Sequence, residues 1–347
     1  MAKDSRTNIP PNDRAEGEIS LKKPAAVGLD IGGSSTKMGV VTLEGQVLWR
    51  DDVPTPQHLD GGTIMQSITA TLDKIVARAR EAHLNLLGIG VSVCGYMEPS
   101  GNAPDYINLH ALDHYPLRPH LVQRYNLPAV LDNDMNCGVL GEYHFGGGKG
   151  VNRLMVMTVG TGIGMAVMLD GQVLRFHGGT VGNPGHIILD PNGPTCVAGC
   201  KGCLESLASA GPIARRAEDM ARAQRPTLLA AMLAEKGALT PKDLFQAAEA
   251  GDQPAREIWD EVGKWLGRGL ASWVEIFGPE VVIVGGGVAQ SGHWLLDPIE
   301  SEMRRTGEPY FMQRVHRVVL STLGRDIAML GAASMCLFPE HAPHWKT

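Results

Sequence analysis

The segment from Gly182 to Glu205 carries a histidine, three cysteines and a glutamate at the spacing of a metal site. Cysteine thiolate and histidine imidazole are the ligands that a tetrahedral zinc ion prefers, and four protein ligands with no open position make a structural site. Cys200 and Cys203 form a C-x-x-C pair, and Cys196 lies one short loop earlier. We therefore expect a structural Zn²⁺ in this loop. Its expected ligands are His186, Cys196, Cys200 and Cys203.

Three glycine-rich segments follow apolar runs and could hold phosphate groups, although each alone could also be an ordinary tight turn. Glycine lets backbone N–H groups approach an anion closely, and serine or threonine hydroxyls add donors. The sequence contains neither a G-x-x-x-x-G-K-[ST] loop nor a strand-to-helix G-x-G-x-x-G, so the P-loop and classical Rossmann interpretations lose support. The candidate nucleotide-binding residues are Gly32, Gly33, Ser34, Ser35, Thr36, Lys37, Gly160, Thr161, Gly162, Gly164, Gly285, Gly286 and Gly287.

Acidic residues stand at the ends of two apolar runs. Asp30 precedes the first glycine segment, where its carboxylate could bind Mg²⁺ or orient the waters of the ion, or could simply cap the turn. Residues 131–136 read Leu-Asp-Asn-Asp-Met-Asn, a polar cluster that ends an apolar strand. A positioned aspartate there could take the proton from a substrate hydroxyl as it attacks phosphorus. Aspartate or asparagine at such a position could equally cap the following helix.

Strands and helices must position these groups. Residues 25–42 predict two strands around a glycine turn, which is a hairpin and not the strand-to-helix entry of a nucleotide-binding βαβ unit. Residues 63–83 carry apolar residues at three- and four-residue steps, the pattern of an amphipathic helix. The strand–turn–strand pattern recurs about 130 residues later, which favours two related lobes. Further strands are expected at 87–93, 129–132, 153–158, 165–169 and 280–284, and helical sequence dominates 204–277.

Length and composition bound the class of protein. A chain of 347 residues has room for about two domains. A net charge of −6 and a pI of about 6.1 leave no broad basic surface, so we expect neither nucleic acid nor membrane as a partner. Residues 1–23 lack the apolar core of a secretory signal, and we expect a disordered polar leader there. Clustered cysteines beside a histidine, without a signal peptide, favour a reducing compartment, so a cytoplasmic location is expected.

Taken together, these motifs resemble those of the ROK family of repressors and sugar kinases, a branch of the larger actin/hexokinase-like ATPase superfamily. The resemblance runs from about Val27 to Leu337, with several motifs in the order of the family. It implies an α/β, two-lobed actin-like ATPase (ribonuclease H-like) fold with a ligand cleft between the lobes. It also implies an N-terminal lobe at 24–133, a C-terminal lobe at 134–325, and a C-terminal helix at about 326–338 that packs back on the first lobe.

The resemblance implies a role for single residues. Asp134 is similar to the catalytic aspartate of the family, which would be the general base, and Asp30 would organise Mg²⁺. The glycine segments would bind ATP. His186 would bind zinc through one ring nitrogen and face the sugar with the other. The residues implied to hold the sugar are Gly95, Asn108, Asn133, Asp134, Asn183, His186 and Glu205.

This chain departs from the family pattern at three places. The family usually reads Gly-Glu-x-Gly-His, and Asn183 here takes the place of the glutamate that helps hold the sugar near its C1 and C2 hydroxyls. An amide donates as well as accepts and bears no charge, so preference at that end should differ. The family zinc motif usually reads C-x-C-G-x-x-G-C, but its middle cysteine is Ala198 here, and we hypothesise that Cys200 supplies the missing ligand. Cys94 stands where many members have proline before Gly95, so the rim of the sugar loop is expected to change.

The leading hypothesis is an ATP-dependent kinase that phosphorylates a hydroxyl of a hexose-like sugar, expected to be the 6-hydroxyl, or of a related polyol. A sugar-responsive transcriptional regulator is the first alternative. Such ROK regulators carry a helix-turn-helix domain ahead of the ROK body, and we expect too few residues for one before the first strand. A non-catalytic sugar-binding protein is the second alternative, disfavoured by Asp134 and the glycine turns. A homodimer is expected from the family alone, and the sequence leaves the acceptor open.

Overall fold

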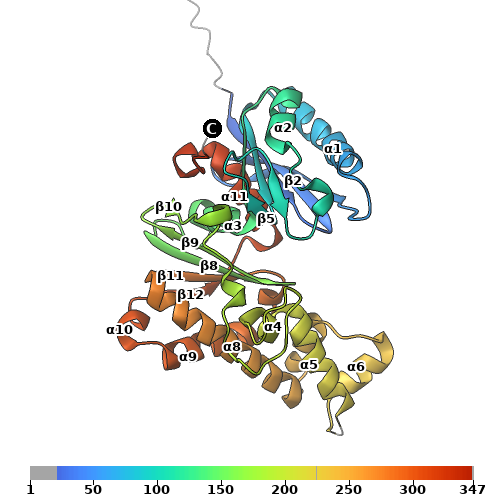
Figure 1. Ribbon diagram of the computed structural model, residues 1–347, viewed down its shortest axis with the longest axis vertical. Coiled ribbons are helices and arrows are strands. Elements are labelled where there is room, and N and C mark those ends of the chain that lie inside the picture. Colours follow the sequence, from blue (N-terminus) through green and yellow to red (C-terminus); the bar gives the residue numbers. More distant parts are fainter. Residues whose placement is uncertain (1–21, 224, 346–347) are drawn as a thin grey trace, which may run out of the picture.

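Two five-stranded sheets form the centre of the protein (Figure 1). The computed structural model describes residues 22–223 and 225–345, so residues 1–21 of the predicted leader lie outside the described residues. The first sheet contains β1 (Pro24–Ile31), β2 (Ser35–Thr42), β3 (Val47–Pro54), β4 (Asn85–Val93) and β7 (Ala129–Asn133). The second sheet contains β8 (Arg153–Val159), β9 (Ile163–Leu169), β10 (Gln172–Val173), β11 (Val281–Gly285) and β12 (Arg317–Leu320).

The two sheets share one topology. Their strand orders are β3-β2-β1-β4-β7 and β10-β9-β8-β11-β12. In each sheet the first three strands in sequence form an antiparallel meander, and the last two run parallel to the first. The two related lobes predicted from the repeated hairpin are thereby confirmed, as are both hairpins.

Helices cover the outer face of each sheet, and two more helices lie between the sheets (Figure 1). The first sheet is covered by α1 (Gly61–Glu81) and α2 (Leu117–Tyr125). The second packs on a layer made of α4 (Leu204–Ala208), α5 (Ala210–Arg222), α6 (Leu228–Lys236), α7 (Pro241–Glu249), α8 (Gln253–Phe277), α9 (His293–Thr306) and α10 (Pro309–Met312). The helices α3 (Asp134–Phe145) and α11 (Ile327–Leu337) lie in the middle, where apolar side chains of α3 meet the second sheet and those of α11 meet both.

The helix predicted at 63–83 is confirmed as α1. Its sequence explains why this segment becomes helical. Its apolar residues at three- and four-residue steps form one buried stripe. Asp60 caps its beginning, because a side-chain oxygen of Asp60 accepts a hydrogen bond from the Thr63 N–H at 3.0 Å. The stripe packs against β2, β3 and β4 and covers the outer side of the first sheet.

Glycines bring α11 into direct backbone contact with the first sheet. A Cβ atom on Gly28 of β1 would lie 2.2 Å from the Met329 carbonyl oxygen, and one on Gly90 of β4 would lie 1.7 Å from the Ala332 carbonyl oxygen. A side chain at either position is therefore excluded by backbone atoms that cannot move aside. This close packing holds the ends of β1 and β4, which carry the candidate site.

Some elements were not predicted. The short hairpin of β5 (Gly95–Met97) and β6 (Pro104–Tyr106) follows β4, and β3, β10, β12, α2, α9 and α10 were also missed. Short 3₁₀ turns complete the described chain: η1 (His110–Leu112), η2 (His177–Gly179), η3 (Pro184–His186), η4 (Val288–Ser291), η5 (Gly324–Asp326) and η6 (Pro339–His341). Among the described helices, none is both long and apolar enough to cross a membrane.

The lobe boundary remains our proposal. We place it between 133 and 134 because β7 ends at Asn133 and α3, which packs on the second sheet, begins at the next residue.

Candidate active site

The ends of three parallel strands gather the acidic candidates. Asp30 on β1 lies opposite Ser92 on β4, and Ser92 lies opposite Asp132 on β7. Asn133 ends β7 and caps α3, because its side-chain oxygen accepts a hydrogen bond from the Met135 N–H at 2.9 Å. The capping role that the sequence left open therefore belongs to Asn133. Asp134 is the first residue of α3, and its carboxylate also accepts from the Met135 N–H at 2.9 Å.

The carboxyl group of Asp134 has a raised pKa. Its burial, and secondly the negative charge of Asp30, raise the pKa from 3.8 to about 6. Hydrogen bonds from the Met135 N–H and from the Cys94 thiol lower this pKa in part. A carboxylate with a pKa near 6 is largely ionised at neutral pH and is basic enough to accept a proton during a reaction. Asp134 is thus suited to general-base chemistry.

Asp30 uses both carboxylate oxygens. One accepts from Lys37 Nζ at 2.9 Å, and the other accepts from Ser92 Oγ at 2.8 Å. Asp30 is therefore a buried strand residue and not a turn cap. Each oxygen has a further lone pair that can accept a hydrogen bond from a metal-bound water, so Asp30 fits an outer-sphere holder of Mg²⁺.

The first glycine turn contacts the expected sugar loop. The side chain of Asn108 lies 2.9 Å from the place that a Cβ on Gly33 would take, so the absence of a side chain at Gly33 makes room for Asn108. Gln57, which no sequence pattern singled out, donates from Nε2 to the Gly33 carbonyl oxygen at 2.8 Å. Ser34 is exposed at the tip. Thr36 is buried and its hydroxyl pairs with Thr55 Oγ1 at 3.0 Å, so this side chain does not point to the turn.

The second and third glycine segments lie side by side because β8 and β11 are parallel neighbours. Gly286 has φ of +91°, and a Cβ on it would lie 2.4 Å from the Val159 carbonyl oxygen, so only glycine fits beside the end of β8. The turn between β8 and β9 is closed by a hydrogen bond from the Gly160 N–H to the Gly162 carbonyl oxygen at 2.9 Å. Thr161 is exposed there.

Met135 joins the two halves of the site. It follows Asp134, and Thr158 Oγ1 on β8 lies 3.0 Å from its sulfur. The same sulfur lies 2.6 Å from the place that a Cβ on Gly164 would take. The structure therefore places the residue that follows Asp134 against the strands that flank the second glycine turn, while Asp134 itself is close enough to Asp30 for that charge to raise its pKa.

The expected sugar-binding residues form two pairs and an exposed amide. Asn133 Nδ2 donates to the Gly95 carbonyl oxygen at 2.8 Å. Glu205 accepts from the Ile163 N–H at 3.1 Å, and its other oxygen lies 4.0 Å from His186 Nε2. Glu205 thus lies against the second glycine turn. Asn183 is exposed, and its Nδ2 lies 3.4 Å from the hydroxyl of Tyr96 on β5.

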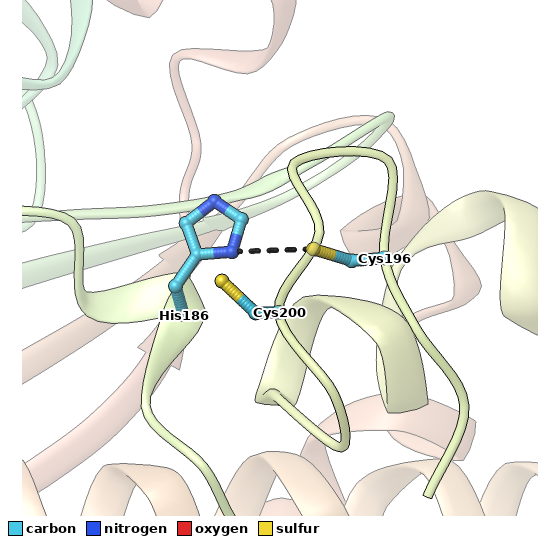
Figure 2. A group of neighbouring side chains, drawn as sticks. All are labelled: His186, Cys196 and Cys200. Atoms are coloured by element: carbon cyan, nitrogen blue, oxygen red, sulfur yellow. Dashed lines mark hydrogen bonds between the residues drawn. The ribbon is translucent and has the colours of Figure 1, made fainter.

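His186 and the cysteines converge in the loop before α4 (Figure 2). His186, Cys196 and Cys200 each place a ligand atom within 4.8 Å of the others. His186 Nδ1 lies 3.6 Å from Cys196 Sγ and 3.7 Å from Cys203 Sγ. With Zn–S of about 2.3 Å and Zn–N of about 2.0 Å, a tetrahedral site requires an N···S separation of roughly 3.5 Å. The donor set therefore fits zinc, and that Cys200 replaces the cysteine absent at Ala198 stays a prediction.

The sequence analysis did not predict the buried ion pair between Asp132 and Arg175. Asp132 is fully buried, and its Oδ2 accepts from Arg175 Nη2 at 2.6 Å and Nε at 2.9 Å. Asn136 Nδ2 donates to the other oxygen of Asp132 at 2.8 Å and to the Gly179 carbonyl oxygen at 2.6 Å. Asp132 is thus committed to structure, which leaves Asp134 as the aspartate of the polar cluster available for chemistry. The 43-residue separation of Arg175 and Asp132 gave no local signal.

Comparison with known proteins decides the family. Residues 26–338 match the model of the ROK family. The chain belongs to the ROK family. A glucokinase of Halalkalibacterium halodurans is 34% identical to this ROK protein over 310 residues, which cover 88% of this chain and 92% of the relative. The crystal structure of a ROK family glucokinase from Streptomyces griseus, in complex with glucose and AMPPNP, superposes with a TM-score of 0.75 at 33% identity and covers 90% of this chain and 98% of that one.

ROK repressors are also similar. The xylose repressor of Caldicellulosiruptor bescii is 27% identical over 333 residues, which cover 94% of this chain and 82% of the repressor. The match to the glucokinases therefore spans more of the relative than the match to the repressor. Membership of the ROK family and the two-lobed actin-like α/β fold, both expected from the sequence, are confirmed.

Proposed function

We propose that this ROK protein is an ATP-dependent sugar kinase that phosphorylates a hydroxyl of a hexose-like sugar, at its 6-hydroxyl, or of a related polyol. The observation that carries the proposal is the place of Asp134, a carboxylate with a raised pKa near Asp30, whose neighbour Met135 contacts Gly164 beside the glycine turn after β8. The similarity to glucokinases over almost their whole length supports it. A transcriptional regulator is the less supported alternative, because the repressor is 27% identical to this chain, whereas the glucokinase is 34% identical.

In the proposed reaction Asp134 orients and deprotonates the acceptor hydroxyl. The hydroxyl oxygen attacks the γ-phosphorus in line, its proton passes to Asp134, and the bond from phosphorus to the bridging oxygen of ADP breaks. The backbone N–H groups of the two glycine turns hold the phosphates. Mg²⁺, when bound, neutralises charge on the phosphate oxygens, and Asp30 would hold it through its waters. Asp134 is rigidly placed because it begins a helix whose cap, Asn133, is itself bonded to Gly95.

The acceptor side is proposed to contain Asn108, Asn133, His186 and Glu205, with Asn183 at the exposed end. The two ring nitrogens of His186 have different neighbours. Nδ1 lies near the cysteines, and Nε2 lies near Glu205. A structural zinc held through Nδ1 would fix this ring, so that Nε2 stays directed at the acceptor. Zinc here would supply no chemistry of its own. A homodimer stays a family-level expectation, which light scattering of the purified protein would test.

A coupled assay tests the proposal. Purified protein with ATP and Mg²⁺ should release ADP only when an acceptor from a panel of hexoses and polyols is present, and NMR of the product should show phosphate on the 6-hydroxyl of a hexose. Asp134→Asn should lower kcat by about 10²- to 10⁴-fold. Asp73→Asn is the matched control, because Asp73 is a surface residue paired with Arg124 on the outer helices, and it should keep wild-type kcat. Acceptor-independent ADP release, or full kcat in Asp134→Asn, would reject the proposal.

A further inference from the structure

The C-terminal segment, residues 339–345, lies beyond the part of the chain that matches the ROK family, which ends at 338. After α11 this segment turns through η6, and Trp345 returns to the first sheet, where it bonds to Leu131 of β7. His341 anchors it to α3, because His341 Nδ1 lies 3.2 Å from His144 Nε2. The segment therefore has a defined path over the helices that lie between the lobes.

Trp345 near the end of this segment contacts both lobes. Its indole N–H donates to the Leu131 carbonyl oxygen on β7 at 2.9 Å. One end of the ring lies over Gly101, where a Cβ would approach Trp345 Cδ1 to 2.1 Å. The other end lies over Gly179, where a Cβ would approach Cη2 to 2.7 Å. Both glycines have positive φ and no side chain, so the indole fills the space between the two backbones.

The two backbones that Trp345 separates lead to the acceptor side of the site. Gly101 lies in the loop of the β5–β6 hairpin, which begins at Gly95. Gly179 ends η2 and lies four residues before Asn183. A second aromatic contact joins the same two segments, because Tyr96 of β5 packs against Gly178, with Cδ1 2.9 Å from the place of a Cβ. The hairpin and the loop are thus held together by two aromatic side chains, of which Trp345 comes from the end of the chain.

We propose that Trp345 is a positioning residue that fixes the β5–β6 hairpin of one lobe and the 176–186 loop of the other in the geometry that binds the acceptor. This inference rests on the proposed kinase function for its effect on catalysis. Without the indole, the backbone turns at Gly101 and Gly179 lose the surface on which they pack, and the Leu131 carbonyl oxygen loses its hydrogen-bond donor. A displacement of about 1 Å in a positioning group can cost on the order of 10²-fold in rate. The glycine turns that would hold ATP lie elsewhere, so ATP binding should be spared.

The kinetic test compares Trp345→Ala and Trp345→Phe with the wild-type full chain. We expect Trp345→Ala to raise KM for the acceptor at least about tenfold while KM for ATP changes less than about twofold. Trp345→Phe fills most of the space but lacks the N–H, so it should recover most of the loss. Trp294→Ala is the matched control, because Trp294 lies on α9, where it bonds to Glu249 at 2.5 Å, and it should leave all constants unchanged. An unchanged acceptor KM in Trp345→Ala, or an equal rise in both KM values, overturns the proposal.

A structural readout separates this proposal from the function on which it rests. Hydrogen exchange of the full chain should be faster in Trp345→Ala at 95–106 and at 176–186, while the central strands of both sheets keep their protection. If the wild type phosphorylates no acceptor, the kinase proposal fails, and the exchange experiment still decides whether Trp345 orders the two segments. Equal exchange of these segments in Trp345→Ala and wild type rejects the positioning role. Faster exchange throughout the chain also rejects it, because the residue would then act on global stability only.

Discussion

Replacing Asp134 with asparagine should stabilise the fold while it removes turnover. The ionised carboxylate of Asp134 is unfavourable in the folded protein, because burial and the charge of Asp30 raise its pKa from 3.8 to about 6. A difference of roughly two pKa units corresponds to about 3 kcal/mol of the free energy of unfolding. The lost charge at the beginning of α3 offsets about 0.3–1 kcal/mol of this gain through the helix dipole. We therefore expect Asp134→Asn to be about 2 kcal/mol more stable at pH 7.5.

The dependence on pH distinguishes this cause from a general packing effect. A group whose pKa is raised on folding contributes stability below its unfolded pKa and loses that contribution as pH rises through its folded pKa. The ionised carboxylate therefore lowers the free energy of unfolding of the wild type by its full amount above about pH 6. Below pH 3.8 this loss disappears, because Asp134 is protonated in both the folded and the unfolded state. The gain from Asp134→Asn should be full at pH 7.5 and shrink as pH approaches 4.

Denaturant unfolding at several pH values measures this gain. Asp73→Asn serves as a control of opposite sign, because the hydrogen bond from Arg124 lowers the pKa of Asp73, and this variant should lose up to about 1 kcal/mol at pH 7.5. A loss of stability in Asp134→Asn at pH 7.5 would refute the reasoning. So would a gain of the same size at pH 4, because it could not arise from the charge.

Three further predictions follow from the same site. The kcat/KM of the wild type should fall tenfold per pH unit below about pH 6 and stay level above it, because Asp134 of the free enzyme must be ionised to accept a proton; an acid limb near pH 4 in the profile of kcat/KM against pH would contradict this. Elemental analysis should find about one zinc per chain, with loss in Cys200→Ser and retention in Cys94→Ser, and zinc in both variants would exclude Cys200 as a ligand. Asn183→Glu should raise kcat/KM about tenfold for acceptors that present two adjacent hydroxyls to this position, because a carboxylate accepts both in charge-assisted hydrogen bonds; an unchanged ranking of the acceptor panel would place Asn183 outside the acceptor site.

The sequence predicted the elements whose signal is local. Apolar runs around glycine turns gave both hairpins, and the three- and four-residue spacing gave α1. Thr36 was counted among the phosphate-binding candidates, but its hydroxyl is buried against Thr55, and a local rule could have excluded it. Alternate residues of a strand point to opposite faces, so Thr36 cannot share the face of its neighbour Lys37, which pairs with Asp30.

The rest depends on contacts between distant segments. The strands β5 and β6 have three residues each and lie in a stretch rich in proline and glycine, so no periodicity could be detected there. The partner of Asp132 lies 43 residues away, and its identity as Arg175 follows only from the fold. The raised pKa of Asp134 likewise depends on the fold, because it arises first from burial and second from the charge of Asp30, which the parallel pairing of β1, β4 and β7 brings near.

The shared strand order of the two sheets has a consequence for the history of the site. In the first sheet, β3 and β4 are joined by a segment that contains α1. The equivalent strands of the second sheet, β10 and β11, are joined by more than a hundred residues. That longer connection contains His186, the cysteines, Glu205 and the helices from α4 to α8. The protein thus has the geometry of a tandem duplication into which one insertion entered. The proposed phosphate turns belong to the repeated core, and the half of the proposed acceptor site beside the proposed zinc belongs to the insertion, so a change of acceptor in this family member requires no change in the repeated core.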